Sequence, residues 1–283
     1  MKILRVAAFL ASAAAFGQTD TSKAPVFGWT HSMTAGVTLS QIAFTDWSAG
    51  GDNSLSWVVS LDGKSVRDEA TTNWASTYKF AFGQARISDA GLRKTDDRIE
   101  LESILTYKLN QYVNPYAGIT FKSQFATGFK YNTPVPGQDQ RVSAFFDPAY
   151  LTQSAGAGWQ ATKEVKTRLG LALREIFSAK YGYADDAATA AVEKSTVEGG
   201  IESTTDVDWK VAENILFTSK LELFAAFKAF DRVSIRSDNK LTMTVNKYIS
   251  AIMAVQFLNL NTEQFPRTQI KELIAIGLTY NVF

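Results

Sequence analysis

The sequence lacks several residue types that common functions require. Its 283 residues include no cysteine, one histidine and six prolines. Without cysteine the chain has no disulfide scaffold, thiol nucleophile or cysteine-ligated metal site. A single histidine also excludes a metal centre with several histidine ligands. The 29 basic and 28 acidic side chains nearly balance, so no basic excess indicates nucleic acid. We therefore expect no cofactor, no metal and no nucleic-acid partner.

After its first residues the chain also lacks the roughly 18 uninterrupted apolar residues of a transmembrane helix. The first segment, Met1–Gly17, has Lys2 and Arg5 before an apolar run and ends on small residues. This pattern is typical of a secretory signal peptide, removed after residue 17. The alternative is a buried or interfacial N-terminal helix. We expect an exported protein with a periplasmic N-terminal segment, 18–31, before the main domain.

Apolar and polar residues alternate through most of the remaining chain. In 166–174, three leucines occupy odd positions and three basic residues occupy even positions. Strict alternation is typical of a β-strand with one apolar and one polar face. The pattern predicts about twelve strands, near 32–44, 53–63, 71–87, 98–110, 115–131, 150–162, 165–181, 196–210, 215–229, 234–247, 249–261 and 268–283.

These faces predict an all-β fold: a transmembrane, antiparallel, up-and-down β-barrel of about twelve strands over residues 32–283. The alternative is a soluble β-sandwich or soluble barrel with its apolar faces inward, but a twelve-stranded interior is wide for these side chains to fill. Turned outward, the same faces make the apolar band that lipid requires, around a polar interior. An open sheet cannot span lipid because its edges would stay unpaired.

The connections between the predicted strands alternate in length. Short turns near 111–114, 163–164, 211–214 and 247–248 alternate with longer loops near 45–52, 89–97, 132–148, 182–195, 230–233 and 261–267. The connection 63–70 is long for its class. Outer-membrane barrels place short turns in the periplasm and long loops outside, so we expect both termini to be periplasmic. A periplasmic-side aromatic belt is predicted at Tyr107, Tyr112, Tyr116 and Tyr248.

Two stretches carry a resemblance to a known family. Val37–Ser56 (VTLSQIAFTDWSAGGDNSLS) and Asp238–Gln256 (DNKLTMTVNKYISAIMAVQ) resemble a Bacteroidota and Chlorobi family catalogued as domain of unknown function 3078. The most specific element is Trp47–Asn53. The resemblance implies an outer-membrane β-barrel and no activity, so it supplies no catalytic residue.

The Trp47–Asn53 run departs from alternation. Gly50 and Gly51 allow positive φ and tight turning, and Asn53 follows them. We favour a structured hairpin with Trp47 at the membrane interface over a surface recognition loop.

Charged residues of both signs fall on the predicted inward faces. They are Arg98, Glu100, Glu102, Lys108, Lys166, Arg168, Arg174, Glu198, Glu202, Asp206, Asp208, Lys220 and Glu222. One interpretation is a lumen held together by ion pairs between neighbouring strands. The other is a narrow charged constriction that selects small polar solutes. We favour the first, and the mixed signs argue against strong ion selectivity.

Catalytic interpretations are weak. The pairs Glu100/Glu102 and Asp206/Asp208 could each serve as acid and base, but such pairs arise by chance in a polar lumen. His31 has Ser32 beside it, and adjacent residues of a strand point to opposite faces. We therefore expect no enzyme. The sequence predicts an outer-membrane barrel that contacts lipid, either a narrow channel for small polar solutes or a structural subunit that binds other envelope proteins.

Overall fold

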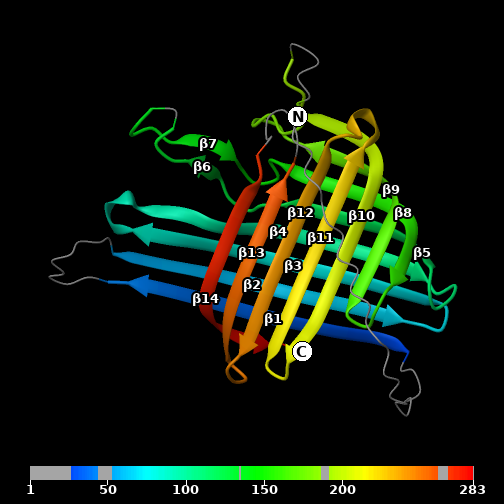
Figure 1. Ribbon diagram of the computed structural model, residues 1–283. Helices are drawn as coiled ribbons and strands as arrows, with labels where there is room; N and C mark the ends of the chain where they lie inside the picture. Colours follow the sequence, from blue (N-terminus) through cyan, green and yellow to red (C-terminus); the bar gives the residue numbers. More distant parts are fainter. Residues whose placement is uncertain (1–26, 44–52, 134, 186–190, 261–266, 283) are drawn as a thin grey trace, which may run out of the picture.

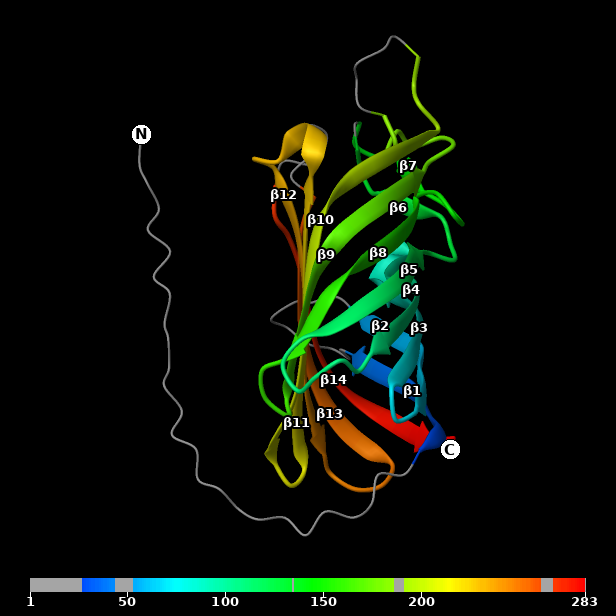
Figure 2. The same ribbon diagram turned by 90° about the vertical axis from the view of Figure 1, so that its right-hand side faces the viewer.

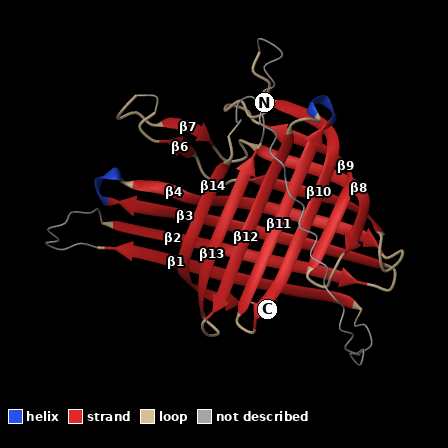
Figure 3. Ribbon diagram, viewed as in Figure 1, coloured by secondary structure: helices blue, strands red, loops and turns tan. Residues whose placement is uncertain are grey.

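The computed structural model of the chain describes residues 27–43, 53–133, 135–185, 191–260 and 267–282. The expected signal peptide Met1–Gly17 lies outside these residues. Within them, long β-strands form one closed barrel of twelve, with a separate two-stranded hairpin beside it (Figures 1 and 3). No helix in this part of the chain is both long enough and apolar enough to cross a membrane.

The barrel strands follow one another in chain order. They are β1 (Gly28–Ile42), β2 (Ser54–Asp68), β3 (Thr72–Ile87), β4 (Leu92–Tyr107), β5 (Asn114–Ser123), β8 (Ala149–Gln160), β9 (Val165–Phe177), β10 (Ser195–Ala212), β11 (Ile215–Ala226), β12 (Val233–Thr244), β13 (Ile249–Asn259) and β14 (Gln269–Asn281). The hairpin β6 (Gly128–Lys130) and β7 (Gln140–Ser143) is inserted between β5 and β8.

Every barrel strand pairs antiparallel with its neighbours, and the first strand closes on the last. In that closing pair Thr34 lies opposite Asn281, and Leu39 lies opposite Ile276. The ring order is β1-β14-β13-β12-β11-β10-β9-β8-β5-β4-β3-β2. The prediction of a closed antiparallel barrel with about twelve strands is confirmed. Closure leaves no unpaired edge, which a lipid environment demands.

Several predicted boundaries of strands and connections were wrong, three of them by several residues. Strand β2 continues to Asp68, so the loop expected at 63–70 is only a short turn. Strand β4 begins at Leu92, inside the loop expected at 89–97. Strand β5 ends at Ser123, well before residue 131. The reason in the first two cases is that polar residues occupy both faces where these strands extend beyond the apolar band, so alternation no longer marks them.

The outer face of the barrel is apolar. On β9, Leu169, Leu171 and Leu173 are all exposed, and on β14 the exposed fractions of Ile274 and Ile276 reach 78% and 67%. The polar residues between them point inward. A contiguous apolar surface of this extent is incompatible with water and matches the lipid-facing band of a transmembrane barrel. The barrel is therefore an outer-membrane architecture with its polar face enclosed.

The two ends of the barrel differ. Short turns at 69–71, 161–164, 213–214 and 245–248 define one end, which we call the short-turn end. The opposite, long-loop end carries 124–148 with the β6–β7 hairpin, drawn in green at the upper left of Figure 1, and the connection between β9 and β10. This alternation is the one predicted.

The expected aromatic belt is present in part. Tyr107, Tyr112 and Tyr248 are exposed near the short-turn end, as predicted. Tyr116 was wrongly included, because it is only 5% exposed. It occupies an even position on β5, whereas the exposed Ile119 marks the odd positions as the lipid-facing ones. Tyr116 therefore points into the lumen.

Candidate functional site: the charged lumen

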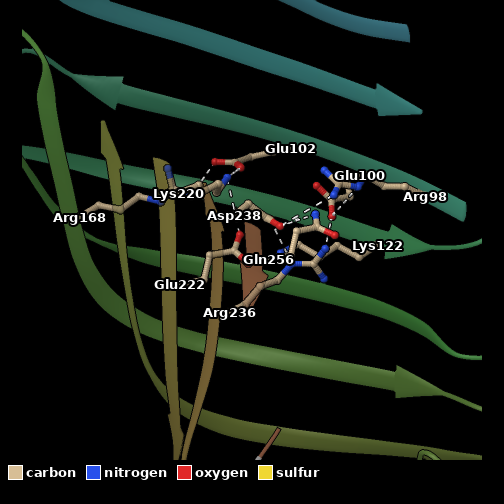
Figure 4. Close-up of polar contacts among 10 residues, drawn as sticks. All are labelled: Arg98, Glu100, Glu102, Lys122, Arg168, Lys220, Glu222, Arg236, Asp238 and Gln256. Atoms are coloured by element: carbon tan, nitrogen blue, oxygen red, sulfur yellow. Dashed lines mark hydrogen bonds and ion pairs between the residues drawn. The ribbon is translucent and has the colours of Figure 1, made fainter. Parts of the chain in front are cut away.

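Inward-facing charges from five strands meet in the middle of the lumen (Figure 4). We call this cluster the lumen network. Its members are Arg98, Glu100 and Glu102 on β4, Lys122 on β5, Arg168 on β9, Lys220 and Glu222 on β11, Arg236 and Asp238 on β12, and Gln256 on β13. The period of two places these side chains on one face of each strand, and barrel closure then turns those faces toward one another.

One half of the lumen network is centred on Glu102. Its carboxylate pairs with the Lys220 ammonium and lies 2.5 Å from Nη2 of Arg168. Lys220 also lies 3.6 Å from Glu222, which pairs with Lys122. The side chains of this half are largely buried. Each carboxylate therefore faces at least one cation, as a buried charge requires.

The other half joins Glu100 to β12. Nη2 of Arg236 lies 2.5 Å from Oε1 of Glu100, and its Nε lies 3.3 Å from Asp238. Asp238 also accepts a hydrogen bond of 2.6 Å from the Gln256 amide and lies 3.8 Å from Arg98. Strands β4 and β12 are six places apart in the ring of twelve, so they are diametrically opposed. These ion pairs cross the whole lumen.

The crossing pairs require a flattened barrel. Its profile is broad in Figure 1 and narrow in Figure 2, where two walls face one another. Charged side chains of ordinary length reach each other between opposite strands only if the cross-section is flattened. The network thus divides the lumen into two sides.

On one side of the lumen, inward-facing aromatic rings pack against glycines of the barrel wall. Tyr116 lies in register with Gly156 on β8, which is in register with Gly170 on β9. A Cβ at Gly170 would lie 2.7 Å from the Tyr116 hydroxyl. In the same way a Cβ at Gly200 would lie 2.8 Å from the ring of Phe224. Only glycine leaves room for these rings against the wall.

The described part of the lumen contains at least two cavities. The first, of about 310 Å³, lies toward the long-loop end and is bordered by Tyr150, Tyr183 and Phe224 together with charges of the network. The second, of about 550 Å³, lies along β1, β2 and β12–β14. Residues from both ends border it, Lys271 near the long loops and Lys247 at a short turn. The lumen network lies between these two spaces.

The predicted lumen residues fall into three groups. Arg98, Glu100, Glu102, Arg168, Lys220 and Glu222 lie in the lumen network. Beside it Arg174 pairs with Glu198 at 2.6 Å, Asp206 lies 3.6 Å from Arg168, and Glu202 accepts a hydrogen bond from Ser154. Lys108, Lys166 and Asp208 lie near the short-turn end, where Lys108 pairs with Asp68 at 2.8 Å.

The pairing differs from the expected ladder between neighbouring strands. Among the predicted residues the pairs Arg174–Glu198 and Arg168–Asp206 follow it, because β9 and β10 are adjacent. The network pairs of Glu100 and Glu102 instead bridge strands that are distant in the ring. Sequence reasoning missed Lys122, Arg236 and Asp238. Their signal was present, since all three occupy even positions of predicted strands.

Neither carboxylate pair is arranged as a catalytic couple. Glu100 and Glu102 are each engaged by cations, and Asp208 is exposed near the short turns, apart from the more enclosed Asp206. His31 accepts or donates one hydrogen bond of 2.9 Å with Ser65 on β2 and stacks on Trp29. In the described part of the chain no three histidine, aspartate or glutamate residues are grouped to hold a metal.

Of the predicted Trp47–Asn53 motif the structure describes only Asn53. Its carbonyl accepts a hydrogen bond of 2.8 Å from the Ser88 amide, which links the β1–β2 and β3–β4 connections. Trp47, Gly50 and Gly51 lie outside the described residues, so the choice between an interfacial hairpin and a recognition loop stays a prediction.

Asp147 organises the long-loop end above the first cavity. Its carboxylate accepts hydrogen bonds of 2.6 Å from the Ser178 hydroxyl and 2.9 Å from the Lys180 amide. Ser178 is 1% exposed, and its hydroxyl oxygen accepts a bond from the Tyr183 amide. Burial, and secondly the charge of Asp147, raise the pKa of the Tyr183 hydroxyl. This cluster joins the loop after β7 to the loop after β9.

Residues 39–129 match the family of proteins of unknown function DUF3078. The DUF3078 match runs from β1 to β6 and therefore includes Arg98, Glu100, Glu102 and Lys122 of the lumen network. No curated protein is significantly similar to the chain.

Solved outer-membrane barrels are similar in outline at very low identity. The translocator domain of the autotransporter NalP from Neisseria meningitidis is 8% identical, with a TM-score of 0.40, 91% of this chain and 89% of that chain covered. An outer membrane channel from Pseudomonas putida F1 is 12% identical, with a TM-score of 0.40 and coverages of 94% and 99%. The NanC porin is 11% identical, with a TM-score of 0.37 and coverages of 88% and 97%.

Proposed function

We propose that this outer-membrane barrel is a narrow channel for small polar solutes. The observation that carries the proposal is the cavity of about 550 Å³ beside the lumen network, bordered by Lys271 near one end and Lys247 at the other. From Lys271 to Thr279 it follows nine residues of β14, which is eight residue steps along the strand. That is about 26 Å of strand, or about 20 Å along the axis at a tilt of about 40°. The apolar band of such barrels is about 25 Å tall.

Conductance of the purified protein in planar lipid bilayers tests this function. We expect small, discrete openings from the natural protein. The double variant Glu100→Ala/Arg236→Ala removes an ion pair that spans the lumen, so it connects the two cavities and raises the unit conductance. The matched control is Arg67→Ala/Glu69→Ala, a pair of similar length, 3.0 Å, that is largely exposed. Its conductance stays at the natural value.

A structural barrel is the second candidate, and the crossing ion pairs favour it. Walls tied together through Glu100 and Glu102 resist deformation and narrow the lumen. In that case the natural protein shows no discrete openings, whereas Glu100→Ala/Arg236→Ala opens. A stoichiometric envelope protein recovered with the barrel would support an assembly role.

The proposed orientation places both termini in the periplasm, after removal of Met1–Gly17 as a signal peptide. The start of β1 at Gly28 pairs with Asp68 at the short-turn end, and the Thr279 amide donates to the Tyr248 carbonyl there. Because the chain has no cysteine, single cysteines report topology cleanly. A membrane-impermeant maleimide should label Gly137→Cys in intact cells and Lys163→Cys only after lysis. The reverse result would invert the orientation.

A further inference from the structure

The charges that border the second cavity are unbalanced. Five basic and two acidic side chains line it. In the lumen network, by contrast, every carboxylate is paired with a cation. The excess of positive charge therefore belongs to the open side of the lumen.

Part of this lining is already paired. Lys271 lies 2.8 Å from Asp96, and Arg98 lies 3.9 Å from Glu100 and 3.8 Å from Asp238. These groups have partners within the wall. Their charges are largely compensated for a passing solute.

The remaining cations have no such partner. Within the described residues no carboxylate oxygen lies within 4.0 Å of the ammonium of Lys79 or of Lys240. Asp62 is the register partner of Lys79 on β2 but is no closer than that limit. At the short-turn end the Lys247 ammonium lies 4.8 Å from the centre of the Tyr248 ring, and it forms no ion pair within 4.0 Å in the described part of the chain.

Lys79 and Lys240 stand on the two flanks of the cavity. Their strands, β3 and β12, are separated in the ring by β2, β1, β14 and β13, the wall of the open side. On either side of this wall a passing solute meets one ammonium that has no carboxylate oxygen within 4.0 Å among the described residues. It meets a third, Lys247, near the short turns.

We propose that the open side of the lumen selects small anions, such as carboxylates or inorganic phosphate. This inference rests on the proposed channel function and names its class of solute. An ammonium about 6 Å from a passing ion changes the local ion concentration about threefold even in water. Because it attracts anions and repels cations, two such groups give a preference well above unity. Rings of lysine or arginine produce anion preference in other pores.

Reversal potentials in a potassium chloride gradient test the inference. We expect the natural protein to pass chloride at least about threefold better than potassium at an ionic strength of about 0.1 M. At about 1 M the Debye length falls from about 10 Å to about 3 Å, so the preference shrinks. Lys79→Gln/Lys240→Gln should reduce this preference clearly while the barrel stays folded, as judged by resistance of the unheated protein to detergent unfolding; Lys247 remains in the lining.

The control is Lys163→Gln, which removes an exposed lysine in a short turn outside the cavity lining. It should keep the natural preference. Discrete openings without anion preference, or a preference that is unchanged in the double variant, would overturn the inference and leave the channel function standing. Absence of openings from the natural protein would overturn the channel function and this inference with it.

Discussion

Replacement of Glu102 by glutamine should measure what the lumen network contributes to stability. The glutamine keeps the shape of the side chain but removes the charge that faces Lys220 and Arg168. Loss of one partner from a buried ion pair costs about 3–5 kcal/mol. Here each cation retains a second carboxylate at 3.6 Å, Glu222 for Lys220 and Asp206 for Arg168. We therefore expect the free energy of unfolding to fall by about 2–3 kcal/mol.

The measurement is urea unfolding of the barrel folded into lipid vesicles, followed by tryptophan fluorescence. The control is Arg67→Gln, which breaks a pair with Glu69 whose side chains are 50% and 39% exposed; such pairs contribute less than about 1 kcal/mol. The double variant Glu102→Gln/Lys220→Gln should lose less than the sum of its single variants, with a coupling of about 1–3 kcal/mol. A Glu102→Gln barrel as stable as Arg67→Gln, without coupling, would refute this account of the lumen.

Three further predictions test other parts of the barrel. Gly156→Ala should lower the free energy of unfolding by about 1–3 kcal/mol, because the new Cβ would clash with the backbone of β9. Gly158→Ala on the same strand would make only ordinary van der Waals contacts, so the free energy of unfolding should change by less than about 0.5 kcal/mol. Unfolding of the two variants in vesicles measures both effects. Leu171→Arg on the lipid face should cost about 2–4 kcal/mol, and Leu216→Arg in the lumen much less. Asp147→Ala should free the loop after β9 for limited proteolysis while global unfolding shifts little.

Each of these has a result that would contradict it. Equal losses for the two glycine variants would mean that the tight contact with β9 is not rigid. If the arginine in the lumen lowered the free energy of unfolding as much as the lipid-facing arginine, the assignment of the lipid-facing side would be wrong. Unchanged proteolysis of Asp147→Ala would show that the loop is held by contacts other than this carboxylate.

The features that could be predicted from the sequence are those that depend only on the alternation of apolar and polar residues. The strands β9, β10 and β11 and the facing of Leu171 or Lys220 follow from alternation, because adjacent residues of a strand point to opposite sides. The residues that meet across the lumen could not be predicted in this way. Alternation assigns a side chain to a face, whereas the pairing of Glu100 with Arg236 depends on ring closure and on how far the cross-section is flattened.

The inward position of Tyr116 shows the same limit. An aromatic residue close to a short turn is typical of an interfacial belt, and this tyrosine matches that description. Its inward direction is set by the parity of β5 and by Gly156 and Gly170, which leave space for the ring. Their alignment exists only after three strands have taken their register, and the sequence alone does not give that register.

The ion pairs across the lumen also constrain the order in which the barrel can be completed. Glu100 and Arg236 are 136 residues apart in the chain, and Glu102 and Lys220 are 118 apart. Until β11 and β12 arrive, Glu102 has Arg168 of β9 but lacks Lys220, and Glu100 has Arg98 at 3.9 Å but lacks Arg236. A barrel that closed early by pairing β1 with a strand before β11 would enclose these carboxylates with only part of their cations, so the ion pairs that connect the finished walls also disfavour premature closure.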